Sequence, residues 1–228
     1  GYNWLPDFVY GGIDGAVTTF AVVAGVEGAN LSLGIILVLG FANLFADAFS
    51  MAVGKYQSDK ADLEQYEKVK KMEFEHLRTK REHEVGEVRE IMEGYGFKGK
   101  DLDRAVAVFT AKGNEESWVD LMMRNEFNMV IEGVNPLRGG FITFVSFVLV
   151  GFIPLVGYTM MALFDFSVEG MFFVTCAFTL FALFIVGAVK SRFSVRKWYF
   201  SGLETMGIGG LAAGIAYFVG VLLKGLAG

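Results

Sequence analysis

The sequence has few residues of the kinds that cross-link chains or build thiolate sites. Among its 228 residues there is a single cysteine, Cys176, which excludes an internal disulfide and argues against a zinc site made of cysteines. Cys176 lies inside an apolar run, where we expect it to pack or to face lipid. Residues 1–54 contain no lysine or arginine, so no basic segment precedes the first apolar run and we expect no cleavable signal peptide.

Charge is also scarce outside one central block. Of the 20 lysines and arginines, 14 lie between residues 55 and 133, together with 18 of the 25 acidic residues and both histidines. The net charge is −5, and no basic face is evident, which argues against a nucleic-acid partner. The acidic block suits cations better, and the uncharged stretches are suited to lipid.

What the sequence has in abundance is apolar residues, at 54% of the chain. About 20 apolar residues are needed for a helix to cross a bilayer. Segments that approach or meet this length predict an all-α, multi-pass integral membrane protein with five transmembrane helices. They are Phe8–Val26, Leu33–Val53, Phe141–Phe164, Val168–Val189 and Met206–Leu223.

The loops between these segments predict the orientation. Cytoplasmic loops carry an excess of basic residues. We therefore place the insert between the second and third spans, and the loop after the fourth span, in the cytosol, with the N-terminus inside and the C-terminus outside. The basic residues concerned are Lys55, Lys190, Arg192, Arg196 and Lys197.

We divide the chain into three parts: 1–54 with the first two spans, 55–135 as a cytoplasmic helical metal-binding insert, and 136–228 with the last three spans. Few residues would end a helix before Gly94, so we expect the second span to continue into the insert as one long helix. A short amphipathic helix capped by Asp101 and a third helix from Asn114 through Phe127 complete a three-helix insert.

Acidic residues and a histidine recur at helical spacing on that long helix. Glu73 and His76 are three residues apart, as are Glu84 and Glu87, and the steps from Glu73 are close to whole turns. Carboxylate oxygen and imidazole nitrogen are ligands of Fe²⁺, Mn²⁺ and Zn²⁺, so the pattern predicts a metal site. The alternative is a solvated helix face whose glutamates pair with nearby cations. Those cations are Lys70, Lys80, Arg81 and Arg89.

Two further patterns bear on this site. Met122, Met123 and Glu126 on the third helix could add thioether and carboxylate ligands, although methionines are usually core filler. Glu73-x-x-His76 also matches half of a di-iron motif, but that motif needs a second copy and only one is present. A ferroxidase is therefore a minor hypothesis.

Within the apolar stretches, Asp14 lies in a glycine-rich part of the first span, and Asn43, Asp47 and Met51 are spaced by four in the second. A carboxylate at membrane depth costs about 2.5–3.5 kcal/mol, so it is a candidate functional group by default. We predict that these four residues line a transport path. The alternative is that the aspartates form hydrogen bonds between helices or lie at the interface.

Gly210 and Gly214 in the last span form a GxxxG motif. The motif permits close helix packing. It is compatible with a dimer and equally with packing inside one chain.

With these residues in view, the sequence resembles the vacuolar iron transporter family, which includes the plant vacuolar iron transporters and the yeast vacuolar iron and manganese carrier. The resemblance covers nearly the whole chain. It rests on Asp14-Gly15, on residues 50–56 at the end of the second span, on the glutamate-rich helix, on residues 120–126 and on residues 202–205.

The resemblance implies a homodimer of five-span subunits that exports cytosolic Fe²⁺, and also Mn²⁺, in exchange for protons. It implies a vacuolar-type or plasma membrane location, no prosthetic group and no enzymatic activity; Zn²⁺ and Co²⁺ are further candidate ions. The insert ligands would be Glu73, Glu84, Glu87, Met122, Met123 and Glu126, and the membrane path would include Asp14 and Met51.

Two positions depart from the family. Plant members place a glutamate where this chain has Asn43, and another where it has His76. Asp47, one turn from Asn43, could supply the missing carboxylate.

The alternative function, from a different functional class, is a membrane-anchored metal-binding or sensing protein without transport.

Overall fold

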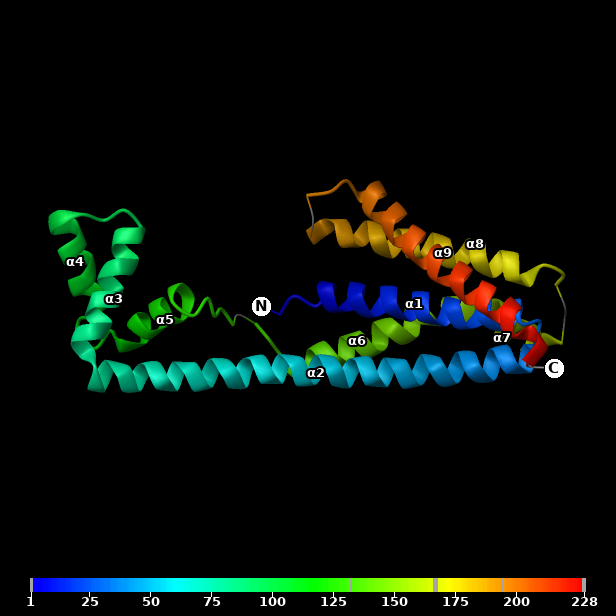
Figure 1. Ribbon diagram of the computed structural model, residues 1–228, viewed down its shortest axis with the longest axis horizontal. Coiled ribbons are helices and arrows are strands. Elements are labelled where there is room, and N and C mark those ends of the chain that lie inside the picture. Colours follow the sequence, from blue (N-terminus) through cyan, green and yellow to red (C-terminus); the bar gives the residue numbers. More distant parts are fainter. Residues whose placement is uncertain (1, 132, 166–167, 194, 227–228) are drawn as a thin grey trace. The chain divides into compact units, whose positions relative to one another are not determined.

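The computed structural model describes residues 2–131, 133–165, 168–193 and 195–226, and within these ranges the secondary structure is helical, with no strand (Figure 1). The chain divides into two compact units. We call Tyr2–Gln57 together with Asn135–Gly228 the membrane unit, and Ser58–Val134 the insert unit. The predicted all-α class is confirmed.

The membrane unit contains the helices that are long and apolar enough to span a bilayer. Four helices of the described chain meet that test, and a fifth span results if one bent pair is counted as one. They are α1 (Leu5–Gly28), α2 (Leu33–Thr79, which continues into the insert unit), the bent pair α6 (Pro136–Gly151) and α7 (Ile153–Phe164), α8 (Met171–Lys190) and α9 (Trp198–Leu223).

The expected single helix over Phe141–Phe164 is wrong in shape. The structure has α6 and α7 bent by 56° around Phe152. Pro154 explains the bend, because proline has no N–H to donate to the carbonyl of Val150 and its ring clashes with that carbonyl.

Helix α1 lies between α6 and α9 and approaches both very closely (Figure 1). A Cβ atom added to Gly15 would lie 2.4 Å from the carbonyl oxygen of Phe147 on α6, and one added to Gly220 on α9 would lie 2.0 Å from that of Gly25. Glycine is therefore required for backbone-to-backbone packing at these positions. By contrast, a Cβ on Gly214 would meet nothing within 4 Å, so this glycine of the GxxxG motif does not pack helices inside the chain.

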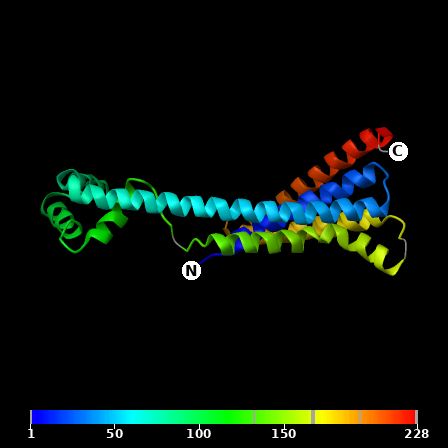
Figure 2. The ribbon, with the colours of Figure 1, turned by 90° about the horizontal axis from the view of Figure 1, so that it is seen from below.

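The part of α2 that belongs to the membrane unit runs beside α6 (Figure 2). Leu44 is buried against Gly151, and a Cβ on Gly140 would lie 2.7 Å from the carbonyl oxygen of Ala52. Its other face is open, with Phe45 and Phe49 exposed. In a membrane such a face meets lipid or another protein.

The insert unit is formed by the last part of α2, α3 (Arg81–Gly94), α4 (Gly99–Phe109) and α5 (Glu115–Asn125). Trp118, Met122, Met123 and Val88 are fully buried and form its core. The glycine turn after Gly94 is as expected.

The expected continuous helix to Gly94 is wrong, because the backbone leaves the helical conformation at Lys80 (φ −132°, ψ 33°) and α3 starts in a new direction. Contacts of Arg81 hold this corner. Its guanidinium donates a hydrogen bond to the carbonyl of Thr110 (2.6 Å) and lies 5.0 Å from the ring centre of Trp118. These tertiary contacts outweigh the local preference to continue the helix.

Candidate metal centre and membrane path

The corner between α2 and α3 brings Glu73, His76 and Glu84 together. One potential ligand atom from each lies within 4.8 Å of the others. The Nδ1 atom of His76 is 3.3 Å from Oε1 of Glu73 and 3.6 Å from Oε1 of Glu84. The residues were predicted to share one face of one helix, but the structure gathers them from two helices.

The two glutamates of this group are almost inaccessible to solvent. Glu73 and Glu84 are each 1% exposed, and the Oε2 atom of each accepts no hydrogen bond from any described residue. Leaving a buried acceptor unpaired costs about 1–3 kcal/mol, and more when it is charged. A cation bound between these carboxylates would offset this cost.

Glu87 and Glu126 belong to the same electrostatic group, which we call the carboxylate cluster together with Glu73, Glu84 and His76. Burial, followed by repulsion from Glu87 and Glu73, raises the pKa of Glu84 to about 7. Burial also raises the pKa of Glu73 and of Glu126, and in both cases Glu87 adds to the rise. Carboxylates that repel one another in this way attract a cation.

The expected alternative, a solvated face with local ion pairs, does not fit these positions. Lys70 pairs instead with Glu116 (3.1 Å) and Asp120 (3.4 Å) on α5. Arg89 pairs with Asp103 on α4 at 2.8 Å. Two of the cations named for that alternative therefore contact other helices, while Glu73 and Glu84 are buried.

His83 was not among the predicted ligands. Its Nε2 atom lies 3.3 Å from Oε1 of Glu87, four residues further along α3. This spacing is a recognisable helical signal. His83 is 70% exposed, so it contacts the cluster from the solvent side.

The two methionines lie in the hydrophobic core of the insert unit. Met122 and Met123 are fully buried and pack with Trp118 and Val119. Their burial fits the core-filling alternative as well as a ligand role, so thioether ligation stays a prediction. Met122 is one turn before Glu126, where α5 ends.

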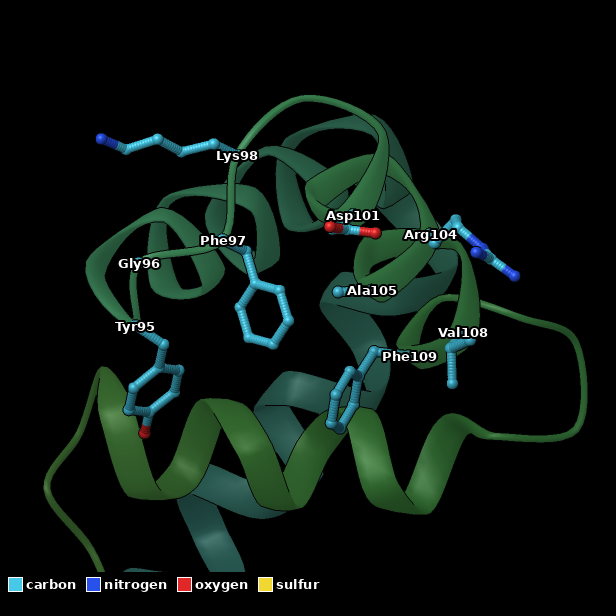
Figure 3. Close-up of a pocket in the computed structure, with 9 residues that line it drawn as sticks. All are labelled: Tyr95, Gly96, Phe97, Lys98, Asp101, Arg104, Ala105, Val108 and Phe109. Carbon is cyan, nitrogen blue, oxygen red and sulfur yellow. The ribbon is translucent and has the colours of Figure 1, made fainter.

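The insert unit also has a groove of about 660 Å³ (Figure 3). None of its described lining residues belongs to the carboxylate cluster. The rings of Tyr95, Phe97 and Phe109 face into the groove, whereas Lys98 and Arg104 extend away. Among the described residues that line it, only Asp101 carries a carboxylate, so the groove does not offer a set of metal ligands.

In the membrane unit, Asn43, Asp47 and Met51 form a stripe along α2, and Asp14 projects from α1. The side-chain amide of Asn43 donates a hydrogen bond to Oδ2 of Asp47 (2.8 Å). Asp14 and Asp47 are close enough to repel each other electrostatically. All four residues are partly exposed, so the stripe is open on one side of the chain.

Comparison with known proteins fits this arrangement of a membrane unit and an acidic insert. Residues 5–221 match the VIT family. The chain belongs to the VIT family. This match confirms the resemblance found in the sequence.

Relatives of the VIT family extend the match over most of the chain. The Vacuolar iron transporter 1 of Arabidopsis thaliana is 35% identical over 216 residues, which is 93% of this chain and 83% of that protein. The Vacuolar iron transporter of Toxoplasma gondii is 35% identical over 228 residues, 97% of this chain and 75% of that protein. That of Centaurea cyanus is 34% identical over 216 residues, covering 93% and 85%. VIT family members are transporters and not enzymes, which sets the ferroxidase hypothesis aside.

Proposed function

We propose that the protein is a proton-coupled transporter that moves Fe²⁺, and also Mn²⁺, from the cytosol into a vacuole-like compartment or across a plasma membrane. The observation that carries this proposal is the carboxylate cluster of the insert unit. In it Glu73 and Glu84 are buried, and one oxygen of each has no hydrogen-bond partner in the described chain. Carboxylate and imidazole ligands suit Fe²⁺, Mn²⁺, Zn²⁺ and Co²⁺. The family membership and the relatives' names favour iron.

In this proposal the insert lies in the cytosol and collects the ion. Glu73, His76 and Glu84 hold it, with Glu87 and Glu126 beside them. Met122 and Met123 are proposed as further ligands because they lie on α5 close in sequence to Glu126. A soft sulfur would favour Fe²⁺ over Mg²⁺ or Ca²⁺.

The ion then passes Asp14 on α1 and the α2 stripe, which consists of Asn43, Asp47 and Met51. Asp47 supplies the carboxylate that plant relatives place one turn earlier, and Asn43 holds it by a hydrogen bond. Protonation of the aspartates from the acidic side would release the ion. Each pH unit across the membrane is worth about 1.4 kcal/mol for each proton exchanged.

We also propose that two copies enclose this path as a homodimer. The side chain of Asp14 forms no hydrogen bond or ion pair with any described residue, and the α2 stripe is open on one side. Exposing carboxylates to lipid is costly, so a second copy that covers the stripe would stabilise it. The open face of Gly214 is a further position for close contact between copies.

The test is uptake of Fe²⁺ and Mn²⁺ into proteoliposomes with and without an acidic interior. The intact chain is expected to take up metal only with the acidic interior. Asp14→Asn is expected to fold and to lose transport, because it removes the charge without changing the size of the side chain. Full metal flux through that variant would contradict the mechanism.

The proposal competes with a membrane-anchored metal sensor that binds without transport. The unpaired carboxylate of Asp14 disfavours this alternative, because an anchor has no use for a charged group in the membrane. Metal binding without any uptake into the liposomes would support the sensor.

A further inference from the structure

The membrane unit contains a pocket of about 420 Å³ where α1 ends and α2 begins. Glu27, Asn30, Tyr158 and Tyr217 carry the polar side-chain groups among its described lining residues, and the other side chains there are apolar. No lysine or arginine is among the described residues that line it. The pocket is at the opposite end of α1 from Asp7, which pairs with Lys55 shortly before the chain passes to the insert unit.

Glu27 is held firmly in this pocket. The hydroxyl of Tyr158, on α7, donates a hydrogen bond to Oε1 of Glu27 at 2.7 Å, and Tyr158 itself is only 2% exposed. The backbone N–H of Asn30 donates to the carbonyl of Glu27 (2.9 Å), which fixes the turn that brings Asn30 to the pocket. The carboxylate therefore has a fixed position, and its second oxygen accepts no hydrogen bond from any residue that the structure describes.

Glu27 forms no ion pair with any described residue, unlike Asp7 and Glu204. Asp7 lies 3.2 Å from Lys55, and Glu204 lies 3.3 Å from Arg196. The last turn of α1 contains no basic residue, so the partial negative charge of the helix end adds to that of Glu27. Negative potential collects in a pocket with mainly apolar walls, where it is poorly screened.

We propose that this pocket is the release site for the transported divalent cation, with Glu27 as its charged ligand and Tyr158 as the residue that positions Glu27. This inference rests on the proposed transport function. Glu27 follows Asp14 by 13 residues in α1, about 20 Å along the helix. Glu27 is the next carboxylate of α1 after Asp14 towards this end of the unit.

The ligand set suits release better than storage. One carboxylate, with the side-chain oxygen of Asn30, leaves most positions around the ion to water. A site on a conduction path must be favourable enough to be entered and weak enough to be left. The carboxylate cluster of the insert unit has several charged ligands and should bind the ion more tightly.

The test measures inhibition of uptake by metal already inside the liposomes. An acidic interior drives only those molecules whose insert faces outwards, so internal Mn²⁺ competes at the pocket of the same molecules. Initial Fe²⁺ uptake is measured against increasing internal Mn²⁺ for the intact chain and for Glu27→Gln, Tyr158→Phe and Glu169→Gln. The Glu27→Gln substitution removes the charge and keeps the contact, because the new amide oxygen can still accept the hydrogen bond of Tyr158.

Glu27→Gln is expected to raise the internal Mn²⁺ concentration that halves uptake about tenfold, equivalent to about 1.4 kcal/mol. Tyr158→Phe should raise it about threefold, because the charge stays and only its position is loosened. Glu169→Gln is the matched control, since Glu169 is exposed beside the pocket and does not line it. If the intact chain transports and Glu27→Gln behaves like Glu169→Gln, the release site is overturned; if the intact chain does not transport, the proposed function itself fails.

Discussion

The amide of Asn43 and the carboxylate of Asp47 are joined by a hydrogen bond of 2.8 Å, one turn apart on the membrane part of α2. This contact orients the carboxylate that we assign to the transport path. We expect Asp47→Asn to reduce Fe²⁺ flux at least tenfold, because a neutral amide cannot replace the ionised ligand. Proteoliposome uptake measures the effect. Glu204→Gln, which removes an acid that pairs with Arg196, is the control and should transport normally.

A second prediction concerns metal binding by the insert unit. Glu73→Gln and Glu84→Gln should each weaken Mn²⁺ binding by about tenfold or more, because each removes a charged ligand from a buried site. Titration calorimetry of the full chain in detergent checks this. Glu82→Gln changes an exposed glutamate on the same helix as Glu84 and should bind as the intact chain does. Equal Mn²⁺ affinities for Glu82→Gln and Glu84→Gln would contradict the assignment of the carboxylate cluster as the metal site.

Metal binding by the insert should strengthen as the pH rises through 7. Burial and neighbouring carboxylates raise the pKa of Glu84 to about 7, so below that pH a proton must leave before a metal can bind. We expect the dissociation constant of Mn²⁺ to fall several-fold between pH 6 and about pH 8. Calorimetry in buffers of different ionisation heat would also detect the released proton. A pH-independent affinity would contradict the raised pKa.

The metal-free protein should show the opposite dependence of stability. The pKa of Glu84 is raised from its ordinary value of 4.5 to about 7, so the folded state holds a proton that the unfolded state has lost. Its contribution to stability is fully present below pH 4.5 and is lost as the pH rises to about 7. At pH 8 without metal, Glu84→Gln should therefore stabilise the insert unit by about 1–2 kcal/mol.

Tryptophan fluorescence can follow this unfolding, because Trp118 is fully buried in the insert core. A background with Trp4→Phe and Trp198→Phe isolates its signal. The midpoint for Glu84→Gln should rise by about 2–8 °C at pH 8 and change little at pH 4. A lower midpoint at pH 8 would show that the charge of Glu84 stabilises the metal-free fold.

The close packing of α1 gives a prediction that does not involve metal. Gly220→Ala would place a Cβ 2.0 Å from the carbonyl oxygen of Gly25, so α9 must move away from α1. We expect a loss of at least about 2 kcal/mol, comparable to other overpacking substitutions. Gly214→Ala meets nothing within 4 Å and is the control within the same helix. Thermal unfolding in detergent compares the two, and equal midpoints would contradict the packing.

The sequence was informative about the spans because each is an apolar run of membrane length. Proline at position 154 was available as a signal for the bend after α6, but length alone suggested one helix. The break at Lys80 had no such signal. It depends on Arg81 reaching Thr110 and the ring of Trp118, and contacts over that separation cannot be inferred from local propensity.

The geometry of the candidate metal site also depends on tertiary contacts that the local sequence does not predict. Helical spacing grouped Glu73, His76 and Glu84 on the assumption of one straight helix. The structure assembles the group at a corner instead, which is also why Glu73 and Glu84 are buried. Burial in a small domain is a tertiary property, and the pattern of charges predicted a solvated face equally well.

The close contacts at the glycines of α1 restrict how this helix can move against its neighbours. Gly15 is pressed against the backbone of α6 and Gly25 faces Gly220 on α9, so sliding α1 past either neighbour would force backbone atoms into one another. The membrane part of α2 has no such restraint on its outer face, where Phe45 and Phe49 are exposed. Helix α1 is therefore restrained by close backbone contacts on two sides, whereas in the described chain α2 has such a contact only with α6, at Gly140 and Ala52. Asp14 lies on the helix that is restrained on both sides, and Asp47 lies on the helix with one open face.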